Sequence, residues 1–420
     1  MAKKTLFHSI LLILLFSVPV LAKDLKIGLN YPRTGPYSVQ GEAQYKSAML
    51  AAKEINKAGG INGRQIKIIA KDSKSVVKVA ENNVKELIDV DGCEMIFGGS
   101  ASSVAIAAGK IAKSRKKIYF GTLTYSNDTT VAEGHKYMFR ECYNAWMAAR
   151  ALTYYLRESG YTGKRFFYIT ADYTWGRTTE SSFRKFSNTS NKRRHKSVLT
   201  PFPGAETKDF ESALKKAAAS KATVLVLVLF GKDMSTALQM AYKMGLKQKM
   251  DAVVVPNLTL GMAQATGPEI MEGVVGSLPW CWKVPYLYGY DKGKSFVEKY
   301  LKQYQSYPST SAASAYTILY QYKDAVERAG TIKTDEVIQS LEGHRFVSLK
   351  DEQSWRKFDH QCVQTVYAVR CRSAADVKKS LHSQDFFEIV DSMSGGEAAR
   401  NKFNWKAARR KAGKPPFLEW

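Results

Sequence analysis

The 420-residue sequence has few of the residues from which metal and redox centres are built. It contains five cysteines and six histidines, and no two cysteines have the Cys-x-x-Cys spacing of zinc and thiol redox motifs. Cys362 and Cys371 bracket one predicted strand, whose ends lie too far apart for a disulfide. We therefore predict no metal and no cofactor, and the pairing of the other cysteines stays open.

Motifs of common catalytic sites are missing as well. The sequence has no Gly-x-Ser-x-Gly elbow, no His-Glu-x-x-His and no phosphate-binding Gly-x-x-x-x-Gly-Lys-Ser/Thr. His360 follows Asp359, but no nucleophile elbow accompanies this pair. We interpret His360 as a structural residue near a hinge, and we predict that the protein is not an enzyme.

Apolar segments long enough to cross a bilayer are missing from the sequence. Near the start, Lys3 and Lys4 precede a short apolar run at 10–16 and the small-residue site Val20-Leu21-Ala22. This pattern is typical of a cleavable secretory signal, and no cysteine follows the cleavage site to take a lipid anchor. We predict a signal peptide at residues 1–22 and a mature chain that is soluble and periplasmic.

Acidic residues are outnumbered, with 38 Asp and Glu against 63 Lys and Arg and a net charge of +25. Nucleic acid is the obvious partner for such a charge, but no nucleic-acid motif is present and export argues against it. We interpret the basic runs at 113–117, 192–196 and 409–411 as solvated helix ends and loops. The positive field can still attract an anionic solute or an acidic partner.

The first structured segment predicts a right-handed β-α-β unit of a parallel sheet. A strand at Leu25–Asn30 precedes a polar loop at 32–41, and Gly59-Gly60 ends the helix that follows. A second strand then runs from Ile66 to Asp72. The apolar face of the helix is predicted from residues at helical spacing, which are Tyr45, Ala48, Met49, Ala51, Ala52 and Ile55.

A family resemblance rests on Thr34-Gly35-Pro36, Gly41 and the run from Glu54 to Arg64. These motifs resemble the opening of the Leu/Ile/Val-type periplasmic solute-binding proteins of ABC transporters, and the resemblance extends to about Tyr367. It implies an α/β, type I periplasmic binding fold, in which two doubly wound parallel-sheet lobes are joined by three hinge crossings.

The resemblance also divides the chain. We expect lobe 1 at residues 23–140 and 280–357, and lobe 2 at residues 141–279 and 358–420, which includes a C-terminal extension. The crossings then lie near Arg140, Pro279 and Phe358. From Ser373 onward the sequence is polar and basic, and we expect short helices wrapped on the second lobe, or partial disorder.

Two loops of the first lobe are candidates for ligand contact. The loop at 98–103 is rich in glycine and serine and opens a helix, which suits a carboxylate, although a plain serine N-cap is the alternative. In the family this loop grips the ligand's carboxylate, which implies roles for Ser102 and Ser103. The loop at 121–126 meets the ligand's amine in the family, which implies Thr124 and Tyr125.

The second lobe adds candidates of a different kind. Trp175 stands where the family places an aromatic residue over the ligand, although a tryptophan packed at a helix start is the alternative. Asn257 stands where Leu/Ile/Val-type proteins commonly have a glutamate for the ligand's ammonium. An amide loses a charge-assisted bond worth roughly 1.5–3 kcal/mol, unless Asp233 supplies the charge instead. Tyr37 and Phe230 are aromatic candidates for the same cleft.

These observations predict the substrate-binding component of an ABC importer. We expect a monomer that captures a small solute between its lobes and delivers it to permease subunits at the inner membrane. A branched-chain amino acid is the family default, and an aromatic or aliphatic carboxylate or amide suits the changed amine pocket better. An exported sensing module that signals to a membrane receptor has the same fold, and the sequence does not separate the two functions.

Overall fold

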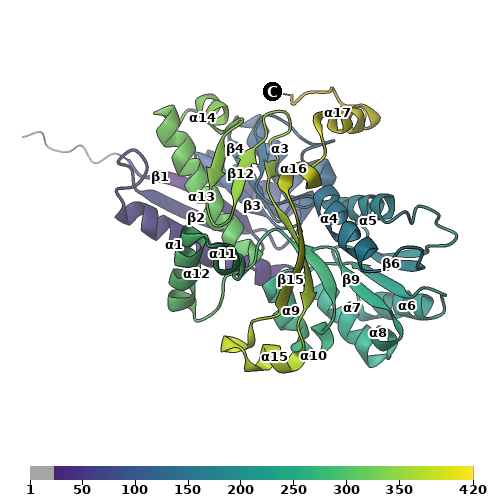
Figure 1. Cartoon of the computed structure of the whole chain (residues 1–420). Coiled ribbons are helices and arrows are strands. Elements are labelled where there is room, and N and C mark those ends of the chain that lie inside the picture. The colour runs from purple at the N-terminus through teal and green to yellow at the C-terminus, as the bar shows by residue number, and fades with distance from the viewer. Residues whose placement is uncertain (1–22, 420) are drawn as a thin grey trace, which may run out of the picture.

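A computed structural model describes residues 23–419 of the protein, so the predicted signal peptide lies outside the described residues. Within them, no helix combines the length and the apolar character that a membrane crossing requires. Two parallel-dominated sheets with helices on their faces form two lobes, which lie side by side in Figure 1. The type I two-lobed α/β fold is therefore confirmed.

The first lobe surrounds a parallel sheet with the strand order β2-β1-β3-β4-β5. The predicted β-α-β unit is confirmed, because β1 and β2 pair in parallel and α1 connects them. Met49 is 40% exposed, so its place on the apolar face of α1 was wrong. The helix instead packs Ala48, Ala52 and Ile55 inward, and Met49 lies at the edge of this stripe. The strands are β1 (Leu25–Tyr31), β2 (Ile66–Asp72), β3 (Met95–Gly99), β4 (Ile118–Thr122) and β5 (Met138–Arg140).

Helices cover both faces of this first sheet, and α1 packs along α13. Between β4 and β5 lies a loop that contains the short 3-10 helix η1 (Asn127–Thr129). The helices are α1 (Ser38–Lys57), α2 (Val77–Asp89), α3 (Ser102–Ser114), α11 (Val284–Tyr288), α12 (Asp291–Tyr304), α13 (Thr310–Ala329) and α14 (Thr334–Leu341).

The second lobe surrounds a sheet with the order β15-β14-β10-β9-β8-β6-β7. The apolar run at 223–229 forms β8, which lies between β6 and β9 and is buried along its whole length, as expected for a central parallel strand. β14 runs antiparallel to β10 and β15. The strands are β6 (Phe166–Ala171), β7 (Ser197–Thr200), β8 (Val224–Val228), β9 (Ala252–Val255), β10 (Val275–Leu278), β14 (Val366–Cys371) and β15 (Phe387–Met393).

The helices of the second lobe follow its strands in turn. α4 begins directly after β5, and the Asn144 side chain caps it by accepting a hydrogen bond from the Met147 N–H, at 3.0 Å. The helices are α4 (Ala145–Glu158), α5 (Thr174–Phe186), α6 (Thr207–Ala218), α7 (Gly231–Lys243), α8 (Leu246–Lys249), α9 (Leu260–Thr266) and α10 (Pro268–Met271).

The chain passes between the two sheets after β5, after β10 and before β14. A small third sheet of β11 (Arg345–Val347), β12 (Glu352–Trp355) and β13 (Cys362–Val363) precedes the last passage, so β13 follows residue 358 and still pairs with β12. Cys362 and Cys371 consequently lie on two strands and not on one, which corrects the sequence interpretation. All five cysteines are buried free thiols.

Buried side chains tie the three passages together. Lys350 donates from Nζ to the carbonyl oxygens of Pro279 and Thr365, at 2.6 and 2.7 Å. Gln361 donates from Nε2 to the Cys142 carbonyl, at 2.8 Å. His360 bonds through Nε2 to Glu342, at 3.0 Å, in agreement with a structural role. Because the bonds of Lys350 and Gln361 connect backbone segments of different passages, they fix the hinge as one unit.

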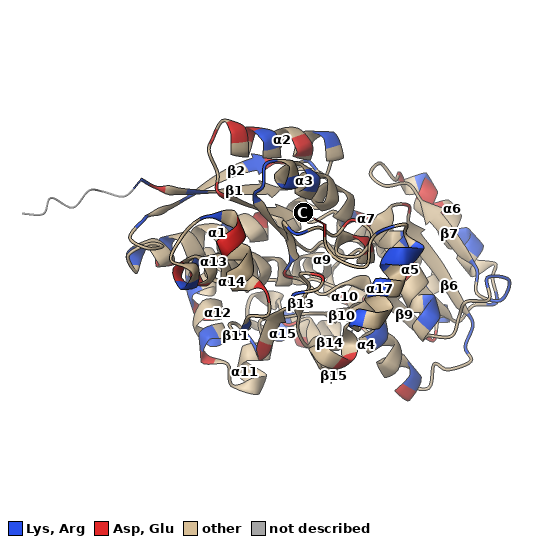
Figure 2. Cartoon of the chain, turned by 90° about the horizontal axis from the view of Figure 1, so that it is seen from above, with Lys and Arg blue, Asp and Glu red and all other residues tan. Residues whose placement is uncertain are grey.

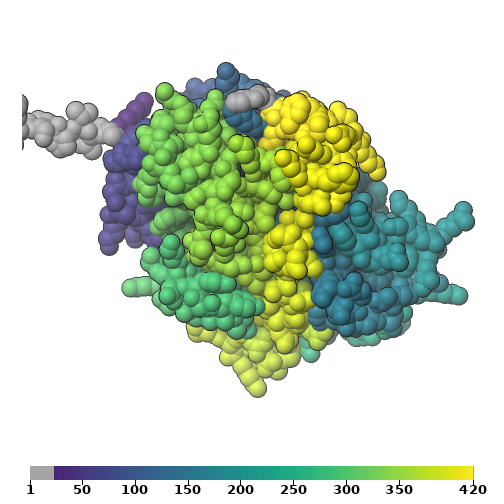
Figure 3. All heavy atoms as spheres, turned by 45° about the horizontal axis from the view of Figure 1, so that its top comes forward, coloured from purple at the N-terminus to yellow at the C-terminus, as the bar shows by residue number. Residues whose placement is uncertain are grey.

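The C-terminal segment contacts both lobes, which the sequence did not predict. β15 adds to the edge of the second sheet, whereas Trp405 of α17 donates from Nε1 to the Thr130 carbonyl of the first lobe, at 2.8 Å. Arg409 was expected to be solvated and is fully buried, because its guanidinium donates to backbone carbonyls, including that of Gly134 at 3.1 Å. Figure 3 shows this segment as a yellow band on the surface. Its helices are α15 (Ala374–Lys379), η2 (Leu381–Ser383), α16 (Gly395–Ala398) and α17 (Lys402–Lys411).

Candidate functional site

Loops at the carboxyl ends of the parallel strands meet between the two lobes. In a doubly wound fold this edge is where ligands bind. Six aromatic rings gather there. Four were predicted and two were not, and they are Tyr37, Tyr125, Trp175 and Phe230, joined by Tyr173 and Phe202.

Tyr37 of the first lobe lies among rings of the second lobe. Its hydroxyl is 2.9 Å from the Tyr173 hydroxyl, and its ring stacks on Phe202 with 5.3 Å between centroids. Phe230 presents its edge to Tyr37 at 5.2 Å. Burial raises the pKa of Tyr37 well above its ordinary value, so the phenol stays neutral. These contacts hold the lobes closed on each other.

A glycine permits this closure. Gly231 begins α7 with φ = 59°, and a Cβ there would lie 2.6 Å from both the Pro36 carbonyl oxygen and the Tyr37 ring. The next residue, Lys232, donates its backbone N–H to the same Pro36 oxygen at 3.2 Å. Since only glycine tolerates both the positive φ and the close approach, residue 231 sets how near the lobes can come.

Tyr125 contributes a polar group with no partner. Its ring contacts Tyr143 at 5.0 Å and Phe230 at 5.9 Å. Its hydroxyl is buried and makes no hydrogen bond within residues 23–419. A buried unpaired hydroxyl costs about 1–3 kcal/mol, so a polar group of a ligand would be favoured beside it.

Trp175 and Asn257 are bonded to each other within the second lobe. Trp175 donates from Nε1 to Asn257 Oδ1 at 3.3 Å, and Asn257 donates from Nδ2 to the Tyr143 hydroxyl at 2.8 Å. Tyr143 in turn donates to the Ser277 carbonyl at 3.1 Å. Both ends of the Asn257 amide are therefore occupied, and its direct role is to orient Trp175.

The predicted carboxylate loop has the expected backbone. Gly98 has φ = 131°, and a Cβ there would lie 2.1 Å from the Asn30 carbonyl oxygen, so glycine is required beside β1. Ala101 occupies the cap position of α3, so the alternative of a plain serine N-cap is wrong. Ser102 and Ser103 are the first helical residues, whose N–H groups have no acceptor within the helix.

Ser102 connects the two predicted loops of the first lobe. Its Oγ accepts from the Ser126 N–H at 3.0 Å, which leaves the hydroxyl proton available to an acceptor. The Ser126 hydroxyl lies 2.7 Å from the Thr174 hydroxyl at the start of α5 in the second lobe. Ser103 is half-buried. Ser126 and Thr174 were missed as site residues, although both flank predicted ones.

The structure does not bring Thr124 to the aromatic cluster through its side chain. The Thr124 hydroxyl lies 2.9 Å from the Thr129 hydroxyl inside the first lobe, and its carbonyl accepts from Arg140 Nη1 at 3.1 Å. The hydroxyl and the carbonyl of Thr124 are therefore both engaged in hydrogen bonds within the first lobe. Thr124 thus shapes the loop that presents Tyr125 and Ser126.

Asp233 is an acidic residue close to the aromatic cluster. It lies in the first turn of α7, half-buried, and its carboxylate is near the hydroxyls of Tyr37 and Tyr173. Burial raises the pKa of Asp233 to about 6, and the neighbouring Lys232 opposes this shift. Asp233 forms no ion pair with another described residue, so it is the alternative source of negative charge for an amine.

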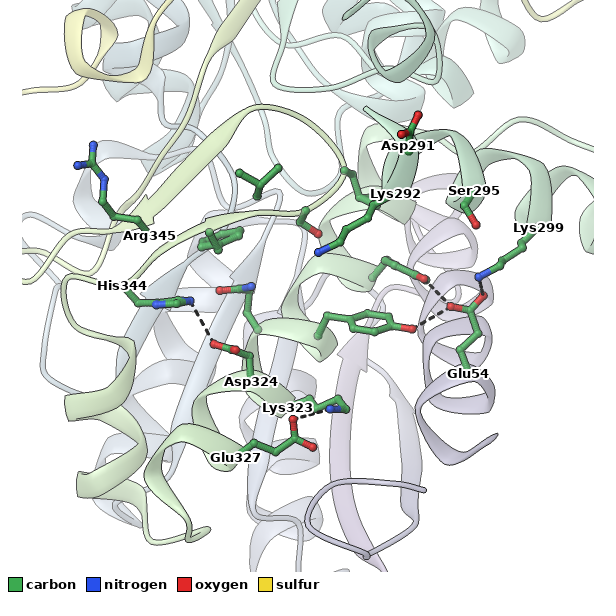
Figure 4. A pocket seen from close by; sticks show the side chains of 17 residues that line it. Glu54, Asp291, Lys292, Ser295, Lys299, Lys323, Asp324, Glu327, His344 and Arg345 are labelled. Atoms are coloured by element: carbon green, nitrogen blue, oxygen red, sulfur yellow. Dashed lines mark hydrogen bonds and ion pairs between the residues drawn. The ribbon is translucent and has the colours of Figure 1, made fainter. Parts of the chain in front are cut away.

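A separate cavity of about 780 Å³ lies in the first lobe, and none of the predicted site residues lines it. Figure 4 shows Glu54 at its edge, where Tyr320 donates a hydrogen bond of 2.9 Å and Lys299 lies at 3.2 Å. Its other charged side chains include His344, whose Nε2 is 3.1 Å from Asp324. These pairs join α1, α12, α13 and the segment before β11, which indicates a structural cluster.

Two doubly wound lobes that meet at the carboxyl ends of their strands define the architecture of a two-lobed solute-binding protein. The chain belongs to the periplasmic binding protein family, whose model matches residues 24–376.

Relatives and solved structures agree with this assignment. The Leu/Ile/Val-binding protein homolog 4 of Brucella melitensis is 25% identical over 355 residues, which cover 81% of this chain and 82% of the relative. A periplasmic binding protein from Burkholderia mallei has a TM-score of 0.81 at 22% identity, with 91% of this chain and 97% of that chain covered. A solute-binding protein of an ABC transporter from Rhodopseudomonas palustris, solved with benzoate, has a TM-score of 0.75 at 20% identity. The match covers 88% of this chain and 96% of that chain.

Proposed function

We propose that this protein is the exported substrate-binding component of an ABC importer. It acts as a periplasmic monomer that captures a small solute between its lobes and presents the closed form to a membrane permease. Family membership and the names of the relatives support this transport role, and they do not favour the sensing alternative. Nucleic acid is not among the partners proposed.

The ligand we propose is a small carboxylate whose second end is neutral or aromatic. The carboxylate would lie at the start of α3, where free N–H groups and the Ser102 hydroxyl can donate. The planar end would lie against Trp175 and Tyr37. The single observation that supports this choice is the bond between Trp175 and the neutral amide of Asn257 in the second lobe. A buried primary ammonium would need a negatively charged partner there, and an amide does not supply one.

A thermal-shift screen tests the function with purified mature protein. Amino acids, aromatic acids and amides are compared, because a ligand at a hundred times its Kd stabilises the folded state by about 2.7 kcal/mol. We expect the aromatic acids to raise Tm most and leucine to raise it little. Small-angle scattering with the best ligand should show a more compact molecule, and unchanged curves at saturation would contradict closure of the lobes.

A further inference from the structure

The C-terminal segment carries a surface that the cleft does not use. The family model ends at residue 376, and α17 with the chain to 418 lies beyond it. We call residues 402–418 the C-terminal surface. Trp405 and Arg409 of α17 are buried against the first lobe, which leaves the opposite face of the helix to solvent.

Two phenyl rings of the C-terminal surface are largely in water. Phe403 is 78% exposed on the outward side of α17, and Phe417 is 60% exposed after it. Placing an aromatic ring in water forfeits the free energy of its burial, so covering Phe403 and Phe417 with an apolar partner would be favourable.

The same segment carries positive charges that nothing in residues 23–419 neutralises. Five basic side chains form no ion pair there, and they are Lys402, Lys406, Arg410, Lys411 and Lys414. Figure 2 shows basic residues on α17 and on the neighbouring α4 and α5. Within residues 402–418 no acidic side chain intervenes. A surface of this kind attracts an anionic surface over the range of a Debye length.

A pocket of about 430 Å³ adjoins the C-terminal surface and has a lining of mixed chemistry. Lys402 and Lys406 contribute positive charge to this lining, and Phe358 and Phe417 contribute aromatic rings. The acid in this pocket, Glu342, is already paired with Lys357 at 3.1 Å and with His360 at 3.0 Å. The pocket therefore suits a molecule with an anionic head beside an apolar part.

We propose that the C-terminal surface docks on an anionic phospholipid bilayer. A headgroup phosphate binds beside Lys402 and Lys406, while Phe403 and Phe417 enter the interfacial region. An acidic protein segment would neutralise the lysines, but it would leave both phenyl rings and the apolar residues of the pocket lining unexplained. The docking goes beyond the proposed function and holds whichever solute the cleft binds. It brings the protein to the surface of a membrane through residues 402–418.

Vesicle co-sedimentation of the mature protein tests the proposal. We expect binding to vesicles of phosphatidylglycerol with phosphatidylethanolamine, weaker binding as salt is raised, and little binding to phosphatidylcholine alone. The variant Lys402→Gln/Lys406→Gln should lose affinity by about tenfold or more. Because neither side chain forms a hydrogen bond or ion pair with residues 23–419, this variant should keep the wild-type Tm, which is measured alongside.

A matched control separates this site from net charge. Lys192→Gln/Arg193→Gln removes two exposed charges from the loop before β7 and should leave vesicle binding within about a factor of two. In a Phe403→Trp variant the new indole emission should shift to the blue on binding and be quenched by brominated lipid. The proposal is overturned if neither vesicle binds the protein or if the control loses as much affinity. It is also overturned if a labelled hexaglutamate peptide binds while anionic vesicles do not.

Discussion

The first-lobe side of the site combines small hydroxyls and backbone groups with the rings of Tyr37 and Tyr125, whereas the second-lobe side is mainly aromatic. On one side are Ser102, Ser126 and the free N–H groups at the start of α3. On the other are Trp175, Phe202 and Phe230, and the Asn257 amide is already bonded to Trp175. A ligand that satisfies both sides has an anionic end and a planar or apolar end.

The largest effect is expected when an aromatic ring of the second lobe is removed. Trp175→Ala removes a ring that is 2% exposed, and it should lower the free energy of unfolding by about 3–5 kcal/mol. It should also weaken binding of an aromatic acid far more than binding of acetate. Urea unfolding and calorimetric titration measure the two effects. The control Trp282→Ala removes a ring outside the cleft, and it contradicts the assignment if it weakens ligand binding equally.

The second prediction adds a negative charge to the second-lobe side of the site, as a pocket for an amine would need. Asn257→Glu places a carboxylate beside Trp175, where it can pair with the ammonium of leucine. We expect leucine binding to tighten by about 1.5–3 kcal/mol relative to wild type and benzoate binding to weaken. Titration of both ligands gives the comparison. Leucine affinity that does not change would show that the ligand's amine lies elsewhere.

Much of the fold follows from local patterns, and less of the site does. The spacing of apolar residues and the position of Gly59-Gly60 predicted β1, α1 and β2, and the uninterrupted apolar run predicted the central β8. These features depend on neighbours in sequence. Tyr173 and Phe202 were missed because they become site residues only when the loops after β6 and β7 meet Tyr37 across the cleft.

The direction of side chains and the burial of a charged residue also could not be predicted from the sequence. Thr124 has the residue type expected for an amine loop, but its hydroxyl bonds to Thr129 inside the lobe. Arg409 belongs to a basic run that is typical of a solvated helix end. The carbonyl groups of Val131 and Gly134, distant in sequence, accept hydrogen bonds from its guanidinium and so make its burial possible.

A smaller effect on ligand affinity is expected when a hydroxyl of the first lobe is removed. Ser102→Ala removes the hydroxyl that lies at the start of α3, and it should weaken any carboxylate ligand by about 1–3 kcal/mol. Ser103→Ala should have less than half this effect, since Ser103 makes no hydrogen bond of its side chain to another described residue. Calorimetry compares the two variants, and equal losses would argue against a specific role for Ser102.

The smallest expected effect concerns pH. Burial raises the pKa of Asp233 to about 6, so the folded protein binds a proton that the unfolded chain releases near pH 4. The stability from this group is present below about pH 4 and is lost as the pH rises through about 6. Asp233→Asn should therefore raise the free energy of unfolding at pH 7 by about 1–2 kcal/mol and flatten its pH dependence. Glu298→Gln, at an exposed position, should do neither.

Calorimetric titration of the mature wild-type protein with leucine and with benzoate tests the central claim most directly. Benzoate has the carboxylate and the planar ring of the proposed ligand class, and it lacks the ammonium for which Asn257 provides no charge. The account predicts that benzoate binds more tightly than leucine. Tight leucine binding that Asp233→Asn abolishes would contradict it, because Asp233 would then supply the charge of an ordinary amino acid site.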